Sequence, residues 1–143
     1  MRHGYFGKGL SRNTNERRRL LMVLAREVIS HGQIKTTRSK AKAVQPMVEK
    51  LVTNAKKGNK REILKKLADE ASVKLLMSWA QERFANRNSG FTRIIKLGPR
   101  SGDGAEEVLF SFVDPAPTAE VKPVEKKVEK KEVKQIKKRK SVK

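Results

Sequence analysis

Positive charge is distributed unevenly along this chain of 143 residues, and that distribution limits where a folded core can lie. Residues 1–60 hold 15 Lys and Arg against 3 Asp and Glu, a net charge of +12. Residues 61–114 hold 9 against 8, which gives +1, and residues 115–143 hold 11 against 4, which gives +7. The total of +20 makes a polyanion the expected partner of the chain.

The two ends of the chain differ in composition from the middle. Residues 115–143 have prolines at 115, 117 and 123, contain no aromatic residue and repeat Lys, Glu and Val. Such a segment buries too little apolar surface to offset the entropy of ordering it. Residues 1–12 combine glycines, which disfavour regular structure, with basic and ring side chains. We therefore expect a basic RNA-binding arm over residues 1–12, one folded domain over residues 13–114, and a disordered basic tail over residues 115–143.

The composition excludes several classes of site. Without cysteine there is no disulfide, no thiolate metal ligand and no cysteine nucleophile, and two histidines leave little for a histidine metal site. No run of 18 apolar residues is present to span a bilayer, and the N-terminus lacks the apolar core of a secretory signal. We expect a small soluble protein that has no cofactor, no metal, no membrane partner and no small-molecule substrate.

Capping residues and apolar spacing predict the order of the elements. Asn13 and Glu16 have the spacing of a capping box, Gly32 is suited to end the helix that follows, and Pro46 should kink or split the next one. The predicted elements are a helix over 13–32, a strand over 33–37, helices capped by Thr37 or Ser39, by Asn59 and by Ser72, and strands over 91–97 and 108–113. The order α-β-α-α-α-β-β predicts a two-layer α+β domain, in which a small antiparallel or mixed sheet packs on helices.

No catalytic set is recognisable, whereas residues that bind phosphate are numerous. The adjacent pairs Asp69-Glu70 and Glu106-Glu107 point in different directions on a helix or a strand, which does not suit two-carboxylate catalysis. Arginine forks, hydroxyl groups and helix N-termini all bind phosphate oxygens. The candidate RNA-binding residues are Arg2, His3, Lys8, Arg12, Arg17, Arg18, Arg19, Lys35, Thr36, Thr37, Arg38, Lys40, Lys42, Arg87, Thr92 and Arg93.

The placement of these charges favours RNA over DNA. They lie on an arm, a helix start and a strand rather than on one recognition helix, and an irregular basic surface suits a folded RNA that is read by shape. The alternative is a DNA-binding nucleoid or regulatory protein, which would be a dimer and would bind any duplex comparably.

Several separated motifs occur in order over residues 1–114. They are Met1-Arg2-His3, Ile34-Lys35-Thr36-Thr37, Lys40-Ala41-Lys42, the segment 83–94 with Arg83-Phe84-Ala85, Arg87 and Gly90-Phe91-Thr92-Arg93-Ile94, then Gly102-Asp103 and Val113-Asp114. In identity and spacing they resemble the family of bacterial large-subunit ribosomal protein seventeen. The chain departs from that family at Gly4 and Tyr5, where a basic residue is usual, and at Pro46, which interrupts a helix that the family keeps basic.

The resemblance implies an α+β fold and a structural, non-enzymatic constituent of the large ribosomal subunit in the bacterial cytoplasm, one that supports translation. It implies binding to large-subunit rRNA near the rim of the peptide exit tunnel, with ribosomal proteins numbers twenty-two and thirty-two as neighbours. It carries RNA contacts onto the matched positions Arg2, His3, Lys35, Thr36, Thr37, Lys40, Lys42, Arg87, Thr92 and Arg93.

Overall fold

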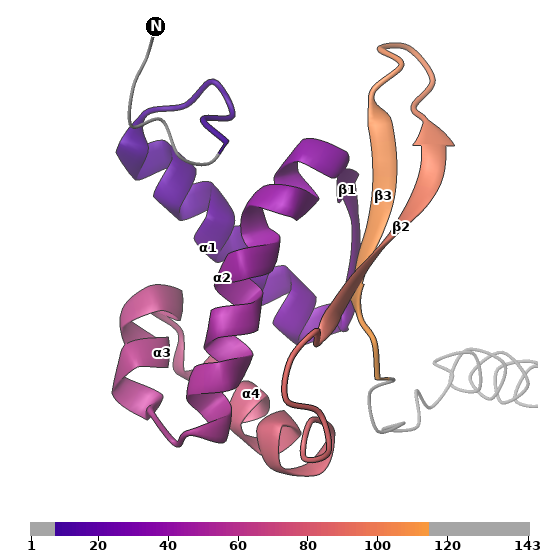
Figure 1. Ribbon diagram of the computed structural model, residues 1–143. Coiled ribbons are helices and arrows are strands. Elements are labelled where there is room, and N and C mark those ends of the chain that lie inside the picture. Colours follow the sequence, from indigo (N-terminus) through magenta and orange to yellow (C-terminus); the bar gives the residue numbers. More distant parts are fainter. Residues whose placement is uncertain (1–7, 115–143) are drawn as a thin grey trace, which may run out of the picture.

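The computed structural model describes residues 8–114, in which helices cover one face of a three-stranded sheet (Figure 1). The elements are α1 (Thr14–His31), β1 (Gln33–Thr37), α2 (Arg38–Lys56), α3 (Lys60–Leu67), α4 (Glu70–Glu82), β2 (Thr92–Pro99) and β3 (Glu106–Phe112). This order confirms the predicted α+β arrangement. The predicted tail, residues 115–143, and residues 1–7 of the predicted arm lie outside the described residues.

The sheet has the strand order β1-β3-β2, and both pairings are antiparallel. The strand predicted over 33–37 therefore pairs with the free side of β3, opposite β2. Because β1 is five residues long and β2 is eight, the far end of the hairpin extends past β1 and projects from the body of the molecule (Figure 1).

The hairpin is longer than predicted. Gly98 and Pro99, which we assigned to the turn, pair with Glu107 and Glu106, and a bulge between Lys96 and Gly98 absorbs the change of register. Proline is tolerated here because β2 is an edge strand, where the missing N–H removes no bond to a neighbour. The turn itself is closed by Arg100, whose N–H bonds the carbonyl of Ala105 at 2.9 Å.

The core lies between the sheet and the helices, with α1 and α2 against the sheet and α3 and α4 packed on those two helices. Near the start of β2 it is aromatic: the ring centroid of Phe84 lies 5.4 Å from that of Phe91 and 5.3 Å from that of Phe112, and Trp79 lies 5.6 Å from Phe112. Elsewhere the core is aliphatic apart from Phe110.

Most of the predicted helix ends are confirmed. Asn13 caps α1, with Glu16 accepting its N–H at 3.3 Å, and Gly32 ends the helix with a left-handed φ of 76°. Pro46 neither splits α2 nor ends it. The cap of α4 was predicted wrongly: Asp69 caps it rather than Ser72, and its carboxylate accepts the Ser72 N–H at 2.9 Å.

Candidate nucleic-acid interface

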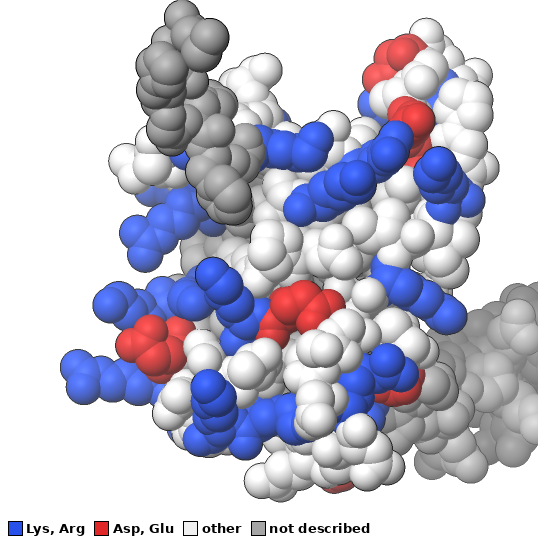
Figure 2. All heavy atoms as spheres, in the orientation of Figure 1, with Lys and Arg blue, Asp and Glu red and all other residues white. Residues whose placement is uncertain are grey.

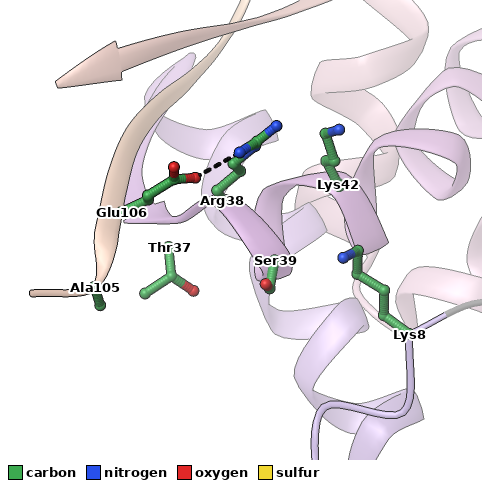
Figure 3. Close-up of a pocket in the computed structure, with 7 residues that line it drawn as sticks. All are labelled: Lys8, Thr37, Arg38, Ser39, Lys42, Ala105 and Glu106. Carbon is green, nitrogen blue, oxygen red and sulfur yellow. Dashed lines mark hydrogen bonds and ion pairs between the residues drawn. The ribbon is translucent and has the colours of Figure 1, made fainter. Parts of the chain in front are cut away.

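One open pocket of about 610 Å³ gathers residues from three separate parts of the chain (Figure 3). Lys8 comes from the segment before α1, the residues around Thr37 come from the junction of β1 and α2, and Glu106 comes from the hairpin. Its full lining is Lys8, Thr37, Arg38, Ser39, Lys42, Ala105 and Glu106. Figure 3 shows Lys8 and Lys42 on one side of Ser39, and the pair of Arg38 and Glu106 on the other. Four of the predicted binding residues therefore meet in one place.

The N-terminus of α2 opens onto this pocket and has no capping side chain or acidic residue of its own. Thr37 is the N-cap but its side chain makes no capping hydrogen bond, and the first turn holds no acidic residue. The first N–H groups of a helix have no partner within it and carry partial positive charge. The hydroxyl groups of Thr37 and Ser39 lie beside them. An anionic oxygen at this helix end would gain hydrogen bonds from both sources.

Two of the predicted cations are partly neutralised by the hairpin. Arg38 donates from Nη1 to Oε2 of Glu106 at 2.7 Å, and Lys35 Nζ lies 2.6 Å from Oε2 of Glu107. The hydrogen bond and charge of Arg38 lower the pKa of Glu106. Lys40 and Lys42 form no ion pair within residues 8–114, so their charges remain available to an external anion.

At the tip of the hairpin a second pair shapes the turn. Arg100 holds the carboxylate of Asp103 through two bonds of 3.0 Å and 2.6 Å. These bonds, with a further one from the Ala105 N–H, lower the pKa of Asp103 to about 2. The carboxylate is therefore ionised at any pH near neutrality, and it belongs to the turn rather than to a binding site.

The start of α1 presents a second group of cations. Arg18 and Arg19 are exposed and Arg17 is half-buried, and none of them forms an ion pair within the described part of the chain. Arg12, just before the helix, donates to the carbonyl of Leu10 at 2.9 Å and is otherwise exposed. Positive charge at a helix N-terminus opposes the macrodipole, so these arginines do not stabilise α1. Figure 2 shows Lys and Arg side chains spread over the face between α1 and the hairpin.

The three predicted binding residues of the segment 87–93, Arg87, Thr92 and Arg93, differ in their surroundings. Thr92 is buried, and both its N–H and its hydroxyl donate to Oε1 of Glu49, at 2.9 Å and 2.5 Å. Arg87 makes a two-pronged contact with the carboxylate of Asp114, at 3.0 Å and 3.1 Å, which raises the pKa of Arg87. The structure thus uses Thr92 and Arg87 to hold the fold, and of this group only Arg93 faces solvent without a carboxylate partner among residues 8–114.

The remaining predicted residues are placed differently. Arg2 and His3 lie outside the described residues. Thr36 pairs with the buried Val108 and is itself half-buried, so it faces the helices rather than solvent. Sequence reasoning missed the part played by Glu49 and Asp114, whose partners lie 27 to 43 residues away. It also considered Ser39 only as a helix cap, although Ser39 lines the pocket.

Two other features were sought among the described residues, a metal site and a membrane-spanning helix. Among residues 8–114 no three His, Asp or Glu side chains come together in a way that could hold a metal ion. None of the helices described is long and apolar enough to cross a bilayer.

Comparison with known proteins agrees with the motifs. Residues 20–113 match the family model described as Ribosomal protein L17. The large ribosomal subunit protein bL17 of Mesorhizobium japonicum is 41% identical over 117 residues, which cover 80% of this chain and 82% of the relative. The bL17 of Salinibacter ruber is 44% identical over 117 residues, 80% of this chain and 59% of its own length. That of Chloroflexus aurantiacus is 43% identical over 116 residues, 79% of this chain and all of the relative.

A match of this extent confirms the resemblance that the motifs indicated. The chain belongs to the ribosomal protein L17 family and is a structural constituent, not an enzyme, of the large subunit of the bacterial ribosome in the cytoplasm.

Proposed function

We propose that the chain binds and organises large-subunit rRNA through the surface formed by the start of α1, the end of β1 and the start of α2. One observation carries the proposal: Lys8, from ahead of α1, lines the same pocket as Thr37, Ser39 and Lys42. Cations, hydroxyl groups and an uncapped helix end converge there, and the one carboxylate in the lining, that of Glu106, is paired with Arg38. Such a surface neutralises several phosphates at once and releases their counterions.

The finer location follows from the family resemblance. The bound rRNA lies near the rim of the peptide exit tunnel, and ribosomal proteins numbers twenty-two and thirty-two are the neighbours. In this position a protein with basic residues on several of its surfaces can bind separate rRNA helices and hold them together. Crosslinking of lysines in intact large subunits, followed by mass spectrometry, tests the neighbours: links from this chain to both proteins are expected, and links only to proteins remote from the tunnel rim contradict the location.

Salt dependence of rRNA binding tests the surface itself. Replacing Arg17, Arg18 and Arg19 together by Ala should weaken binding and reduce the slope of log K against log salt by up to about three, one for each lost phosphate contact. The matched control replaces three exposed cations of α3 by Ala and so removes the same amount of charge. These are Lys60, Arg61 and Lys65, none of which lines the pocket. An unchanged slope in the α1 variant, or an equal loss in the control, contradicts the proposed surface.

A duplex competitor separates this function from general nucleic-acid binding. The full-length chain should prefer large-subunit rRNA over a DNA duplex of equal phosphate concentration at the same salt. Equal affinity for both would favour the duplex-binding alternative, because counterion release alone does not distinguish the two polymers.

A further inference from the structure

A second pocket, of about 410 Å³, lies at the other end of the sheet from the surface described above. It is lined by His31, Gln33, Arg83, Arg93, Ser111 and Phe112, among others, and no carboxylate is among its lining residues. Gln33 begins β1 and Thr37 ends it, so the two pockets are separated by the length of that strand, about 13 Å at 3.3 Å per residue.

The register of the sheet places one row of polar groups across this pocket. Ser111 of β3 pairs with Gln33 on one side and with Arg93 on the other. Arg93 donates from Nε to the Ser111 hydroxyl at 3.4 Å, a weak bond that leaves the rest of its guanidinium available. Arg93 is exposed and forms no ion pair within residues 8–114. An amide, a hydroxyl and a free guanidinium thus stand in line.

Arg83 contributes a second guanidinium that is held rigidly. Its central carbon lies 4.7 Å from the ring centroid of Trp79, 5.0 Å from that of Phe112 and 5.4 Å from that of Phe84. Its Nε donates to the carbonyl of Asp114 at 2.6 Å, and its Nη2 donates to the same oxygen. Nη1 is buried and has no hydrogen-bond partner among the described residues.

This environment is costly for a cation. Burial lowers the pKa of Arg83, and the nearby charge of Asp114 only partly opposes that effect. The carboxylate of Asp114 is engaged by Arg87, and Glu27 is paired with His31 at 3.2 Å. The three rings and the Asp114 carbonyl compensate part of this lost hydration, but none of them carries a full negative charge. An anion in the pocket would add the opposing charge.

We propose that this pocket binds a phosphate of the RNA backbone, so that the domain holds rRNA at both ends of its sheet. The exposed guanidinium of Arg93, the Ser111 hydroxyl and the Gln33 amide match several oxygens of a phosphodiester, and Arg83 adds positive charge from the aromatic cluster beside them. The inference rests on the proposed rRNA binding and adds to it a contact site and its ligand.

Site-directed photo-crosslinking in assembled large subunits tests this contact. A diazirine-bearing amino acid replaces Gln33, which is exposed and lines the pocket, in the full-length chain. A crosslink to rRNA is expected. A crosslink to protein alone, or none, overturns the proposal.

The same probe placed at Lys42 keeps the two proposals distinguishable. Lys42 lines the first pocket, so a crosslink to rRNA there reports on the proposed function alone. RNA crosslinking at 42 without RNA crosslinking at 33 overturns only the second site. Absence of RNA crosslinks at both positions overturns both.

Binding measurements give the size of the contact. Arg93→Gln keeps a polar side chain and should reduce the salt slope of rRNA binding by about one, the value for one phosphate contact. Arg61→Gln removes one exposed charge from α3 as the matched control and should leave the slope unchanged. A wild-type slope in Arg93→Gln contradicts the proposal.

Discussion

At the scale of single residues, Glu49 joins two parts of the molecule that are far apart in the sequence. It lies in α2, and its two carboxylate oxygens accept three hydrogen bonds from the beginning of β2. Two come from the backbone N–H groups of Phe91 and Thr92, at 3.1 Å and 2.9 Å, and one comes from the Thr92 hydroxyl. Hydrogen bonds to a charged acceptor are stronger than those between neutral groups, so this carboxylate fixes where the hairpin meets the helix.

Replacing Glu49 by Gln should lower the free energy of unfolding by about 1–3 kcal/mol, because an amide offers one acceptor oxygen where the carboxylate offers two. At least one donor of the β2 start then loses its partner. Urea denaturation followed by the fluorescence of Trp79 measures the change. Glu62→Gln, at an exposed position of α3, is the matched control and should change the midpoint little. Equal midpoints for the two variants would show that the Glu49 bonds contribute nothing net.

The contacts of single residues also explain why some site residues could be predicted from the sequence and others could not. Lys8, Thr37, Arg38 and Lys42 were predicted from charge and local spacing, and the structure brings them to one pocket. Thr92 was predicted to bind RNA because its position matches the family motif, yet it donates to Glu49 across 43 residues. This hydrogen bond forms only when α2 packs against β2. The spacing of residues within a short segment of sequence does not predict that packing.

At the scale of elements, α2 runs through Pro46 without a break over nineteen residues. The ring of Pro46 lies on an exposed face, while the buried side chains of Val44 and Val48 anchor the turns on either side. Proline lacks the N–H that would bond the carbonyl four residues before it, so Lys42 has no such partner in the helix. Packing against the sheet holds α2 together where helix propensity opposes it.

Pro46→Ala should therefore raise the free energy of unfolding by about 1–2 kcal/mol, since it restores a helical hydrogen bond and removes an unfavourable residue from a helix interior. Part of that gain is offset because the proline also restricts the unfolded chain. The urea midpoint checks the change, with Lys50→Ala on an exposed position of the same helix as the control. A midpoint that falls in the Pro46 variant would show that the proline stabilises a bend on which the packing depends.

The ends of helices and strands were predicted correctly where they depend on residues close by in the sequence. The capping box at Asn13 and the left-handed Gly32 were both predicted, because each depends on residues within a few positions. The hairpin was predicted too short because its pairing continues through a bulge into Gly98 and Pro99, residues that ordinarily signal a turn. Cross-strand pairing overrode the local turn preference there.

At the scale of the whole molecule, the described carboxylates of the basic half are engaged in holding the fold. Residues 1–60 contain three acidic residues: Glu16 caps α1, Glu27 pairs with His31, and Glu49 holds β2. The hairpin adds two more carboxylates, which pair with Lys35 and Arg38. The excess cations are therefore left at the surface without internal partners. A net charge of this kind suits a protein that is completed by a polyanion.

The division between domain and tail is a prediction at this same scale. Every residue of the described core lies between Ala25 and Phe112, and Arg83 and Arg87 hold the chain at Asp114, just before the tail begins. Deleting residues 115–143 removes 29 residues and a net charge of +7 without touching this core. We therefore expect the truncated chain to melt cooperatively, with a midpoint within about 4 °C of the full-length value, the shift typical of changes outside a packed core. Differential scanning calorimetry of both proteins at the same salt measures it. Loss of the cooperative transition would mean that the last 29 residues belong to the folded unit, and that the domain does not end at Asp114.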